Sequence, residues 1–258
     1  MTGAVLRRQR ELNLGSAGLW DGFAEHRRRV TGLILAHRTG RPASRLVVLG
    51  AGNGNDLELG RLLTAFAAVD LVDIDADALA GAVARQRITP GARLRLHGGV
   101  DLTEATPEQL RRLSQADVVV STTLLTQLID FAAADGATGP ELLAVRDRHL
   151  RLISDLVMPR GTGVLVTDVV SSDTCPPLRG TGIDGLGPLL AECVNAGNFF
   201  TGANPFAIER RLRADPELPL DRIGMAPPWR WDLGERSYLV SALAFRKQAE
   251  WRRIDIAG

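Results

Sequence analysis

The stretch from Arg45 to Asp56, RLVVLGAGNGND, constrains the fold of this 258-residue chain more than any other. An apolar run leads into Gly50, Gly52 and Gly54, and polar residues follow where a helix can begin. Glycine permits backbone conformations and close approaches that a Cβ atom forbids. A strand, a glycine loop and a helix in this order build the nucleotide site at the carboxyl edge of an open parallel sheet. Taken alone, the pattern also fits a tight strand-to-helix turn.

The spacing of the glycines narrows the class of ligand. The dinucleotide fingerprint is G-x-G-x-x-G, with its last glycine where the pyrophosphate meets the helix start. This chain reads G-x-G-x-G, and Asn55 stands where that last glycine would be. The loop therefore favours a ligand that has adenosine but no pyrophosphate.

Acidic residues follow the next two apolar runs. Asp73 ends the run VDLVD about twenty residues after the first glycine, where a carboxylate can accept both ribose hydroxyls. Asp75 precedes a helical pattern and is predicted to be its N-cap. Asp101 follows a third run, and we expect it to accept from an adenine amino group while Val100 and Leu102 cover the ring faces. A solvated turn carboxylate is the alternative for Asp101.

These features, in this order, resemble the class I S-adenosylmethionine-dependent methyltransferases. The resemblance covers residues 45–170 well and the remainder loosely. It runs through LGAGNG, LVDID, GGVDL, DVVVSTTLL and GTGVLVTD. It implies that the glycine loop holds the methionine part of the cofactor, that Asp73 holds the ribose and that Asp101 holds the adenine. The cofactor-binding residues predicted on this basis are Gly50, Ala51, Gly52, Asn53, Gly54, Asn55, Asp56, Asp73, Ile74, Val100, Asp101, Leu102, Ser121 and Thr122.

The chain departs from the family at one position. Members often carry an acid two residues before the first glycine, which helps to hold the cofactor's amino group, and Val48 stands there in this chain. Asn53, Asn55 and Asp56 are the candidates to compensate.

Alternating strands and helices predict the architecture. Strands are expected near 45–49, 69–73, 93–97, 117–121 and 163–168, with helices in most of the gaps. This alternation predicts a parallel sheet with helices on both faces. PWRWDLG and SYLVSALAFRK are predicted to be the last two strands, which the family pairs as an antiparallel edge. We therefore expect one methyltransferase domain over residues 1–258, with a doubly wound, mostly parallel, seven-stranded α/β sheet.

Two regions lie outside the predicted core. Within residues 1–40, a helical apolar stripe predicts a lid over the cofactor site. Residues 171–222 form a long passage between the fifth and sixth strands, and we expect this insertion to cover the substrate site. The stripe comprises Leu19, Phe23, His26, Val30, Leu33 and His37.

Two residues are candidates for acid–base catalysis. His26 lies on the apolar stripe and is expected to point inward, where it is either a general base or a core histidine bonded to backbone. Asp168 is expected at the end of the fifth strand, where catalytic groups gather, or as a loop carboxylate. Ser121 and Thr122 are expected beside the methyl group, with a role in the turn as the alternative.

Aromatic residues in the variable regions suggest an apolar or aromatic small substrate. Trp20, Phe23, Phe199 and Phe200 are the predicted substrate-binding residues, with core packing as the alternative for each. Metal-dependent members place an acid after the fourth strand, and Ser121 stands there instead, so no metal is expected.

Composition excludes several other classes. The net charge of +1 gives no field that favours nucleic acid or an anionic membrane. Two cysteines without metal-type spacing predict a reduced, cytoplasmic protein. No run approaches membrane-spanning length, and the amino terminus lacks the apolar core of a signal peptide.

We therefore predict methyl transfer from S-adenosylmethionine to a small molecule, within a biosynthetic pathway. A cofactor-binding protein of the same fold that acts as a cyclase or a non-catalytic module remains an alternative. A nicotinamide-dependent oxidoreductase and an aminopropyl transferase are weaker alternatives, because Asn55 breaks the dinucleotide fingerprint and STTLLTQL supplies no acids for a polyamine.

Overall fold

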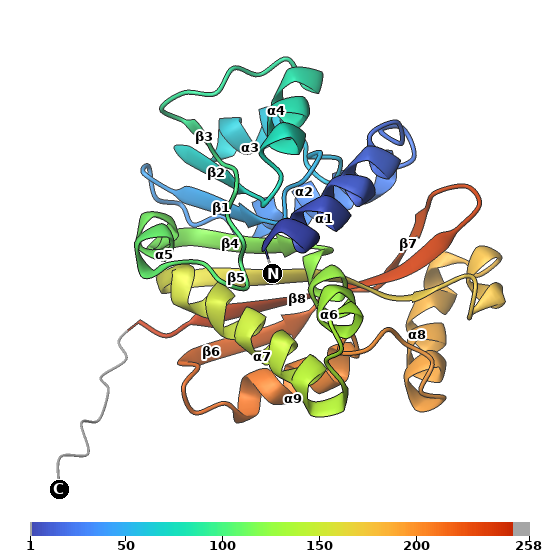
Figure 1. Ribbon diagram of the computed structural model, residues 1–258. Helices are drawn as coiled ribbons and strands as arrows, with labels where there is room; N and C mark the ends of the chain where they lie inside the picture. Colours follow the sequence, from blue (N-terminus) through green and yellow to red (C-terminus); the bar gives the residue numbers. More distant parts are fainter. Residues whose placement is uncertain (1, 250–258) are drawn as a thin grey trace, which may run out of the picture.

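The computed structural model describes residues 2–249 and builds them around one twisted sheet (Figure 1). Its strand order is β3-β2-β1-β4-β5-β8-β6, and β7 pairs with β8 off this path. Strands β1 to β5 pair in parallel, whereas β8 runs antiparallel to β5, β6 and β7. The strands are β1 (Arg45–Leu49), β2 (Ala68–Val72), β3 (Leu94–His97), β4 (Ala116–Thr122), β5 (Val157–Ser171), β6 (Leu220–Met225), β7 (Trp229–Asp232) and β8 (Ser237–Lys247).

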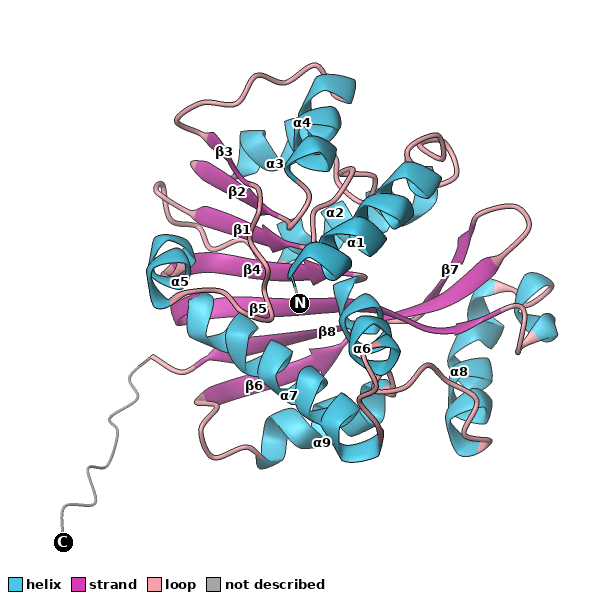
Figure 2. Cartoon of the chain, in the orientation of Figure 1, coloured by secondary structure: helices cyan, strands magenta, loops and turns pink. Residues whose placement is uncertain are grey.

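Helices cover both faces of this sheet, as Figure 2 shows. One apolar cluster joins α2, α3 and α4 to one face, and a second joins α5, α6, α7 and α9 to the other. The α-helices are α1 (Thr2–Ser16), α2 (Ala24–Ala36), α3 (Leu59–Ala65), α4 (Ala76–Arg85), α5 (Pro107–Leu113), α6 (Leu124–Ala134), α7 (Gly139–Leu156), α8 (Leu186–Asn195) and α9 (Pro205–Ala214). Two short 3₁₀ turns, η1 (Pro176–Arg179) and η2 (Ile183–Gly185), precede α8.

The predicted doubly wound architecture with an antiparallel edge is confirmed, and residues 2–249 contain one strand more than the seven expected. Strand β6, which occupies the edge next to β8, is the strand that was not predicted. Its sequence LDRIGM is partly exposed and carries two charges, so it lacks the apolar run that marks a buried strand. The predicted strand PWRWDLG contains β7, which pairs only with the first residues of β8.

The amino-terminal region forms two helices with different positions. Helix α2 carries His26, Val30 and Leu33 of the predicted apolar stripe and packs on the sheet face, with Val30 and Ile34 fully buried. The other three stripe residues lie outside the helix: Phe23 and His37 are its caps, and Leu19 precedes it and is exposed. Helix α1 lies across the carboxyl edge of the strands, near the loops after β1 and β2 (Figure 1). The lid position predicted for the stripe helix is therefore taken by α1.

The passage from 171 to 222 folds into η1, η2, α8, α9 and the start of β6. A third apolar cluster joins α8 and η1 to the carboxyl end of β5 and the amino end of β8. This unit extends the molecule beyond the carboxyl edge of the sheet (Figure 1).

Candidate functional site

The glycine loop after β1 has the backbone that the sequence predicts. Gly50, Gly52 and Gly54 all have positive φ, at 71°, 44° and 62°. A Cβ atom at Gly50 would lie 2.8 Å from the Cβ of Leu124 at the start of α6. Glycine is required here both by φ and by the close approach of α6.

Asp73, directly after β2, is tied to this loop. Its Oδ2 accepts from the backbone N–H of Gly52 at 2.8 Å, and its Oδ1 accepts from the N–H of Asp75 at 2.9 Å. Burial raises the pKa of Asp73 to about 6, although these backbone hydrogen bonds oppose the rise. A carboxylate oxygen has two lone-pair sites, so each can still accept a ligand hydroxyl. Asp75 caps α4 by accepting from Asp77 and Ala78 N–H, as predicted.

Asp101, after β3, has an unsatisfied oxygen. Its Oδ1 accepts from the backbone and the hydroxyl of Thr103, at 2.9 Å and 2.6 Å. Its Oδ2 is buried and has no hydrogen-bond partner among residues 2–249. A buried acceptor without a donor is costly and calls for a ligand or water.

Gly50, Asp73 and Asp101 line one cavity of about 30 Å³. Val5 and Gln9 of α1 close it on one side. Pockets for small-molecule ligands usually measure at least about 300 Å³, so this cavity is too small for a nucleoside while α1 lies in this position. The other lining residues are Ile74, Val100, Leu102, Leu124, Leu128 and Phe131.

Asparagines of the glycine loop hold α1 in this closed position. Asn53 donates to the carbonyl of Asn13 at 2.5 Å, and Asn55 donates to the carbonyl of Ser16 at 2.9 Å. Asn13 also donates to Asp75 Oδ2 at 3.0 Å. Two of the three side chains proposed to compensate for Val48, Asn53 and Asn55, are thus engaged by α1, whereas Asp56 faces His26 of α2. The predicted cofactor residues of this loop that do not line the cavity are Ala51, Gly52, Asn53, Gly54, Asn55 and Asp56.

Ser121 and Thr122, the last two residues of β4, direct their hydroxyl groups to other protein groups. The hydroxyl of Ser121 lies 2.8 Å from Nε2 of His149 on α7, and burial lowers the pKa of that histidine to about 4. Thr122 donates to the carbonyl of Gly50 at 3.3 Å. Neither side chain lines the cavity, and their contact with a cofactor stays a prediction.

His26 is fully buried and both of its ring nitrogens face protein groups. Its Nδ1 accepts from the indole N–H of Trp229 at 3.1 Å. Its Nε2 lies 3.3 Å from Oδ1 of Asp56, and its ring stacks on Trp231 at a centroid distance of 4.4 Å. A neutral imidazole that accepts at Nδ1 carries its proton on Nε2, so neither nitrogen offers a free lone pair to a substrate.

Asp168 lies on β5, three residues before the strand ends rather than at its end. The pairing of β5 with β8 shifts register between Asp168 and Val170, which marks a local irregularity. The Thr126 hydroxyl on α6 donates to Asp168 Oδ1 at 2.7 Å. Burial raises the pKa of Asp168 to about 6, against the opposing effect of that hydrogen bond. A carboxylate with this pKa is suited to accept a proton near neutral pH.

Two of the four predicted aromatic residues belong to one chain of ring contacts. Phe23 lies 4.7 Å from Trp231, which lies 5.3 Å from Tyr238, and Tyr238 lies 6.5 Å from Phe200. These rings connect α2, β7, β8 and the segment after α8.

The other two predicted aromatic residues pack elsewhere. Phe199 packs against the cluster around α8. The ring of Trp20 lies under the guanidinium of Arg27, at 3.5 Å.

Two further observations bear on the class of protein. No three His, Cys, Asp or Glu side chains within residues 2–249 form a group able to hold a metal ion. Over the same residues, no helix is both long and apolar enough to span a bilayer.

Comparisons with known proteins identify the fold. No protein-family model and no curated protein matches the chain. Among solved structures, the methyltransferase domain of bacterial CtHen1-C is 15% identical, with a TM-score of 0.52 over 86% of this chain and 98% of that one. Magnesium protoporphyrin IX methyltransferase from Synechocystis PCC 6803 is 15% identical, with a TM-score of 0.50 over 86% and 83%.

A third solved structure has the same fold. An O-methyltransferase family protein from Burkholderia thailandensis is 15% identical, with a TM-score of 0.51 over 95% of this chain and 61% of that one. The chain therefore has the fold of the class I S-adenosylmethionine-dependent methyltransferases, as its sequence predicts.

Proposed function

We propose that this protein transfers a methyl group from S-adenosylmethionine to a small molecule. The observation that carries the proposal is the buried, unpartnered Oδ2 of Asp101, in the cavity that Gly50 and Asp73 also line. An adenine amino group supplies the missing donor, and ribose hydroxyls fit the remaining lone pairs of Asp73. When bound, the cofactor supplies an electrophilic methyl group.

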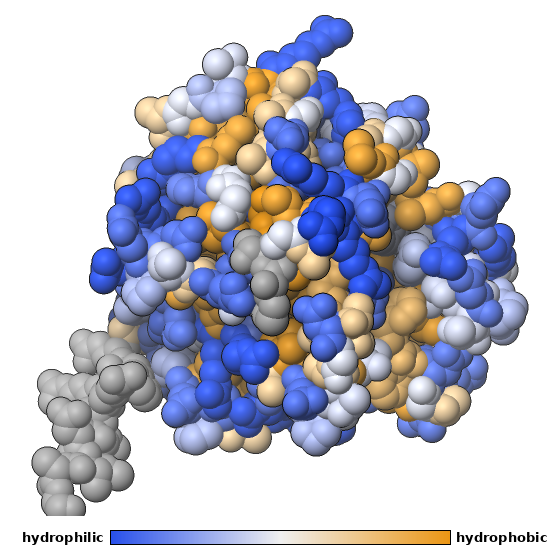
Figure 3. Space-filling view, in the orientation of Figure 1, coloured by the Kyte–Doolittle hydropathy of each residue, from blue (hydrophilic) through white to orange (hydrophobic). Residues whose placement is uncertain are grey.

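Helix α1 has to move before a cofactor can enter, because the cavity that Val5 and Gln9 help to line measures only about 30 Å³. Its contacts to the loop are polar, through Asn13, Asn53 and Asn55, so they can be exchanged for water. The distal part of α1 also exposes apolar side chains beside this edge (Figure 3), with Leu14 77% exposed. Opening of α1 would free the amides of Asn53 and Asn55 for the cofactor's methionine part.

We assign the proton acceptor to Asp168 rather than to His26. The Trp229 indole N–H occupies Nδ1 of His26, and the other nitrogen faces Asp56, which suits a histidine that positions β7 against α2. Asp168 has a raised pKa and lies on the strand next to β4, at the edge where the cofactor's methyl group is expected.

The acceptor molecule is proposed to bind between α2 and the 171–222 insertion. The contacts from Phe23 through Trp231 and Tyr238 to Phe200 give this side of the edge an aromatic character. An apolar or aromatic small molecule is the class of acceptor that such rings favour.

Exchange of the adenine amino group for a carbonyl tests the role of Asp101. In calorimetry, the wild-type protein is expected to bind S-adenosylhomocysteine about 10- to 150-fold more tightly than S-inosylhomocysteine, the scale of a hydrogen bond to a charged group. Asp101→Asn should narrow or reverse this preference, because its amide can donate to the inosine carbonyl. An unchanged preference in Asp101→Asn would exclude Asp101 from adenine recognition.

A further inference from the structure

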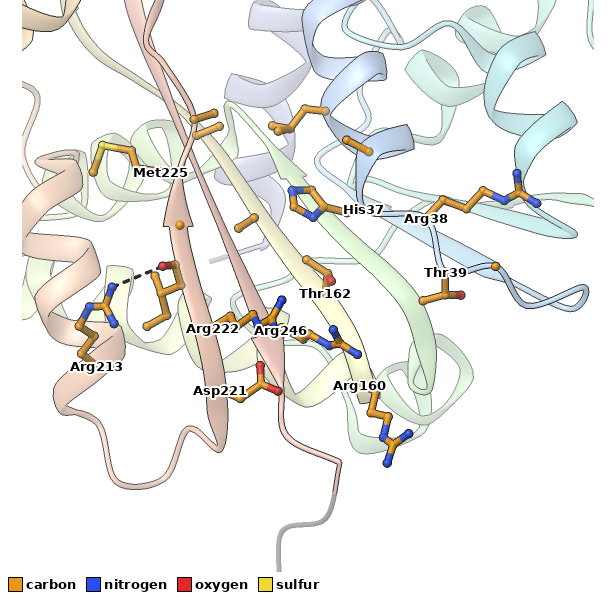
Figure 4. A pocket seen from close by; sticks show the side chains of 18 residues that line it. His37, Arg38, Thr39, Arg160, Thr162, Arg213, Asp221, Arg222, Met225 and Arg246 are labelled. Carbon is orange, nitrogen blue, oxygen red and sulfur yellow. Dashed lines mark hydrogen bonds between the residues drawn. The ribbon is translucent and has the colours of Figure 1, made fainter.

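A groove of about 950 Å³ lies near the amino edge of the parallel strands, away from the glycine loop. Its floor is the face of β5, β8 and β6 that α2 leaves uncovered, and the last turn of α2 forms one wall with Leu33, Ala36 and His37 (Figure 4). The floor is built of small residues, namely Gly224, Ala226, Ala242 and Ala244. A Cβ atom at Gly224 would meet no atom within 4 Å, so the groove is open above it.

Basic side chains gather at one end of this floor. Arg222 of β6 is the register partner of Arg246 of β8, and Arg246 is also the partner of Thr162 of β5. Residues paired across strands project from the same face of a sheet. Figure 4 shows Arg222, Arg246 and Asp221 close together, with Arg160 at the same end. Arg160 has a φ of 65°, a left-handed conformation that is unusual for a residue with a side chain.

The positive charges of Arg160, Arg222 and Arg246 have no partner in the part of the chain that the structure describes. Within residues 2–249, the guanidinium groups of Arg160, Arg222 and Arg246 form no ion pair or hydrogen bond, and Nε of Arg246 is buried without a partner. Asp221 is the only acid among the residues that line the groove. Like charges directly opposite each other destabilise a strand pair. An unpaired, partly buried guanidinium is costly unless an anion completes it.

We propose that this groove binds a small amphipathic anion, whose carboxylate or phosphate group is held by Arg222 and Arg246. The apolar body of the molecule lies along the Gly224, Ala242 and Ala244 floor, against α2. Guanidinium groups bind both kinds of anion through charge-assisted hydrogen bonds, and Thr162 adds a neutral donor. This site is separate from the cofactor cavity and shares no lining residue with it.

Calorimetric titrations with simple probes test this site. Octyl phosphate and octanoate are expected to bind at one site per chain, and a comparison of the two gives the preferred head group. Inorganic phosphate and octanol, which each carry one half of the recognised chemistry, should bind at least roughly tenfold more weakly. Equal binding of octanol would overturn the proposal, and so would tight binding of an RNA oligonucleotide without binding of either amphiphile.

Substitutions of the two arginines and of one glycine in the groove floor test where the amphiphile binds. Arg222→Gln and Arg246→Gln should each weaken amphiphile binding by about tenfold or more, the scale of a hydrogen bond between charged groups. Gly224→Val should block the apolar body, since a Cβ atom at this position meets no protein atom within 4 Å and the added methyl groups enter the groove. Arg148→Gln, an exposed arginine of α7 on the other side of the sheet, is the matched control and should bind as the wild type does.

Melting temperatures and light scattering complete the test. Variants that melt no lower than the wild type but keep full amphiphile affinity would overturn the proposal. A chain that dimerises as the wild type and becomes monomeric as Gly224→Val would show instead that a second copy covers the groove. Addition of octyl phosphate should raise the melting temperature of the wild type and not that of Arg246→Gln.

Discussion

Replacement of Asp168 by asparagine is expected to lower methyl transfer by about 10²–10⁴-fold, the usual contribution of a general base. Asparagine keeps the size of the side chain and can still accept the 2.7 Å hydrogen bond from Thr126, but it cannot take a proton. Binding of S-adenosylhomocysteine should change little, because Asp168 does not line the cofactor cavity. Turnover would be followed with a methyl-labelled cofactor once an acceptor is found.

The pH profile separates this role from a structural one. The pKa of Asp168 is raised to about 6, so the wild-type rate should fall as the pH drops below about 6 and the carboxylate is protonated. Thr126→Val removes a hydrogen bond that lowers the pKa of Asp168, and should therefore move this acidic limb to higher pH. Wild-type turnover in Asp168→Asn, or an unmoved limb in Thr126→Val, would contradict the assignment.

Asp70→Ala is expected to destabilise the fold by about 3–5 kcal/mol, as the loss of one partner from a buried ion pair does. Asp70 is fully buried in β2 and accepts from Arg45, Arg95 and His97 at 2.7, 2.8 and 2.7 Å. Burial alone would raise the pKa of Asp70, but hydrogen bonds from His97, Arg45 and Arg95 overcome it and hold that pKa well below its usual range. Urea unfolding measures the difference.

The sign of the pH effect follows from this depressed pKa. The stabilisation by Asp70 is fully present above the unfolded pKa of about 4 and is lost as the pH falls toward the folded value. The difference between wild type and Asp70→Ala should therefore shrink below about pH 4. Asp77→Ala is the control, because Asp77 is exposed and its ion pair with Arg10 is worth at most about 1 kcal/mol. Equal losses in the two variants would show that the Asp70 network adds no more than a surface pair.

The parallel core could be predicted from the sequence because its strands are buried on both faces. Runs such as Leu46 to Leu49 and Val118 to Val120 are continuously apolar, and glycines and caps mark where they end. Strand β6 lacks this pattern because it is a partly exposed edge. The Asp70 network was not predictable either, since a lone acid inside an apolar run shows its partners only when β1, β2 and β3 are aligned.

The candidate site was predictable where it depends on backbone and strand ends. Gly50, Asp73 and Asp101 converge on one cavity because parallel strands bring their carboxyl ends to one edge. The part played by α1 was not foreseen, although Val5, Gln9 and Asn13 share one face at helical spacing. The engagement of His26 by Trp229 joins residues 203 positions apart, which no local pattern reveals.

Calorimetric titration of S-adenosylhomocysteine and NAD, each into the wild-type protein, decides whether the chain binds the methyltransferase cofactor. We expect one S-adenosylhomocysteine site with micromolar affinity, about −8 kcal/mol, and no binding of NAD. Asp73→Ala should weaken the first interaction by about 1.5–3 kcal/mol, since two ribose hydroxyls lose a charged acceptor. Tight binding of NAD with no binding of S-adenosylhomocysteine would contradict the proposal that this protein is a methyltransferase.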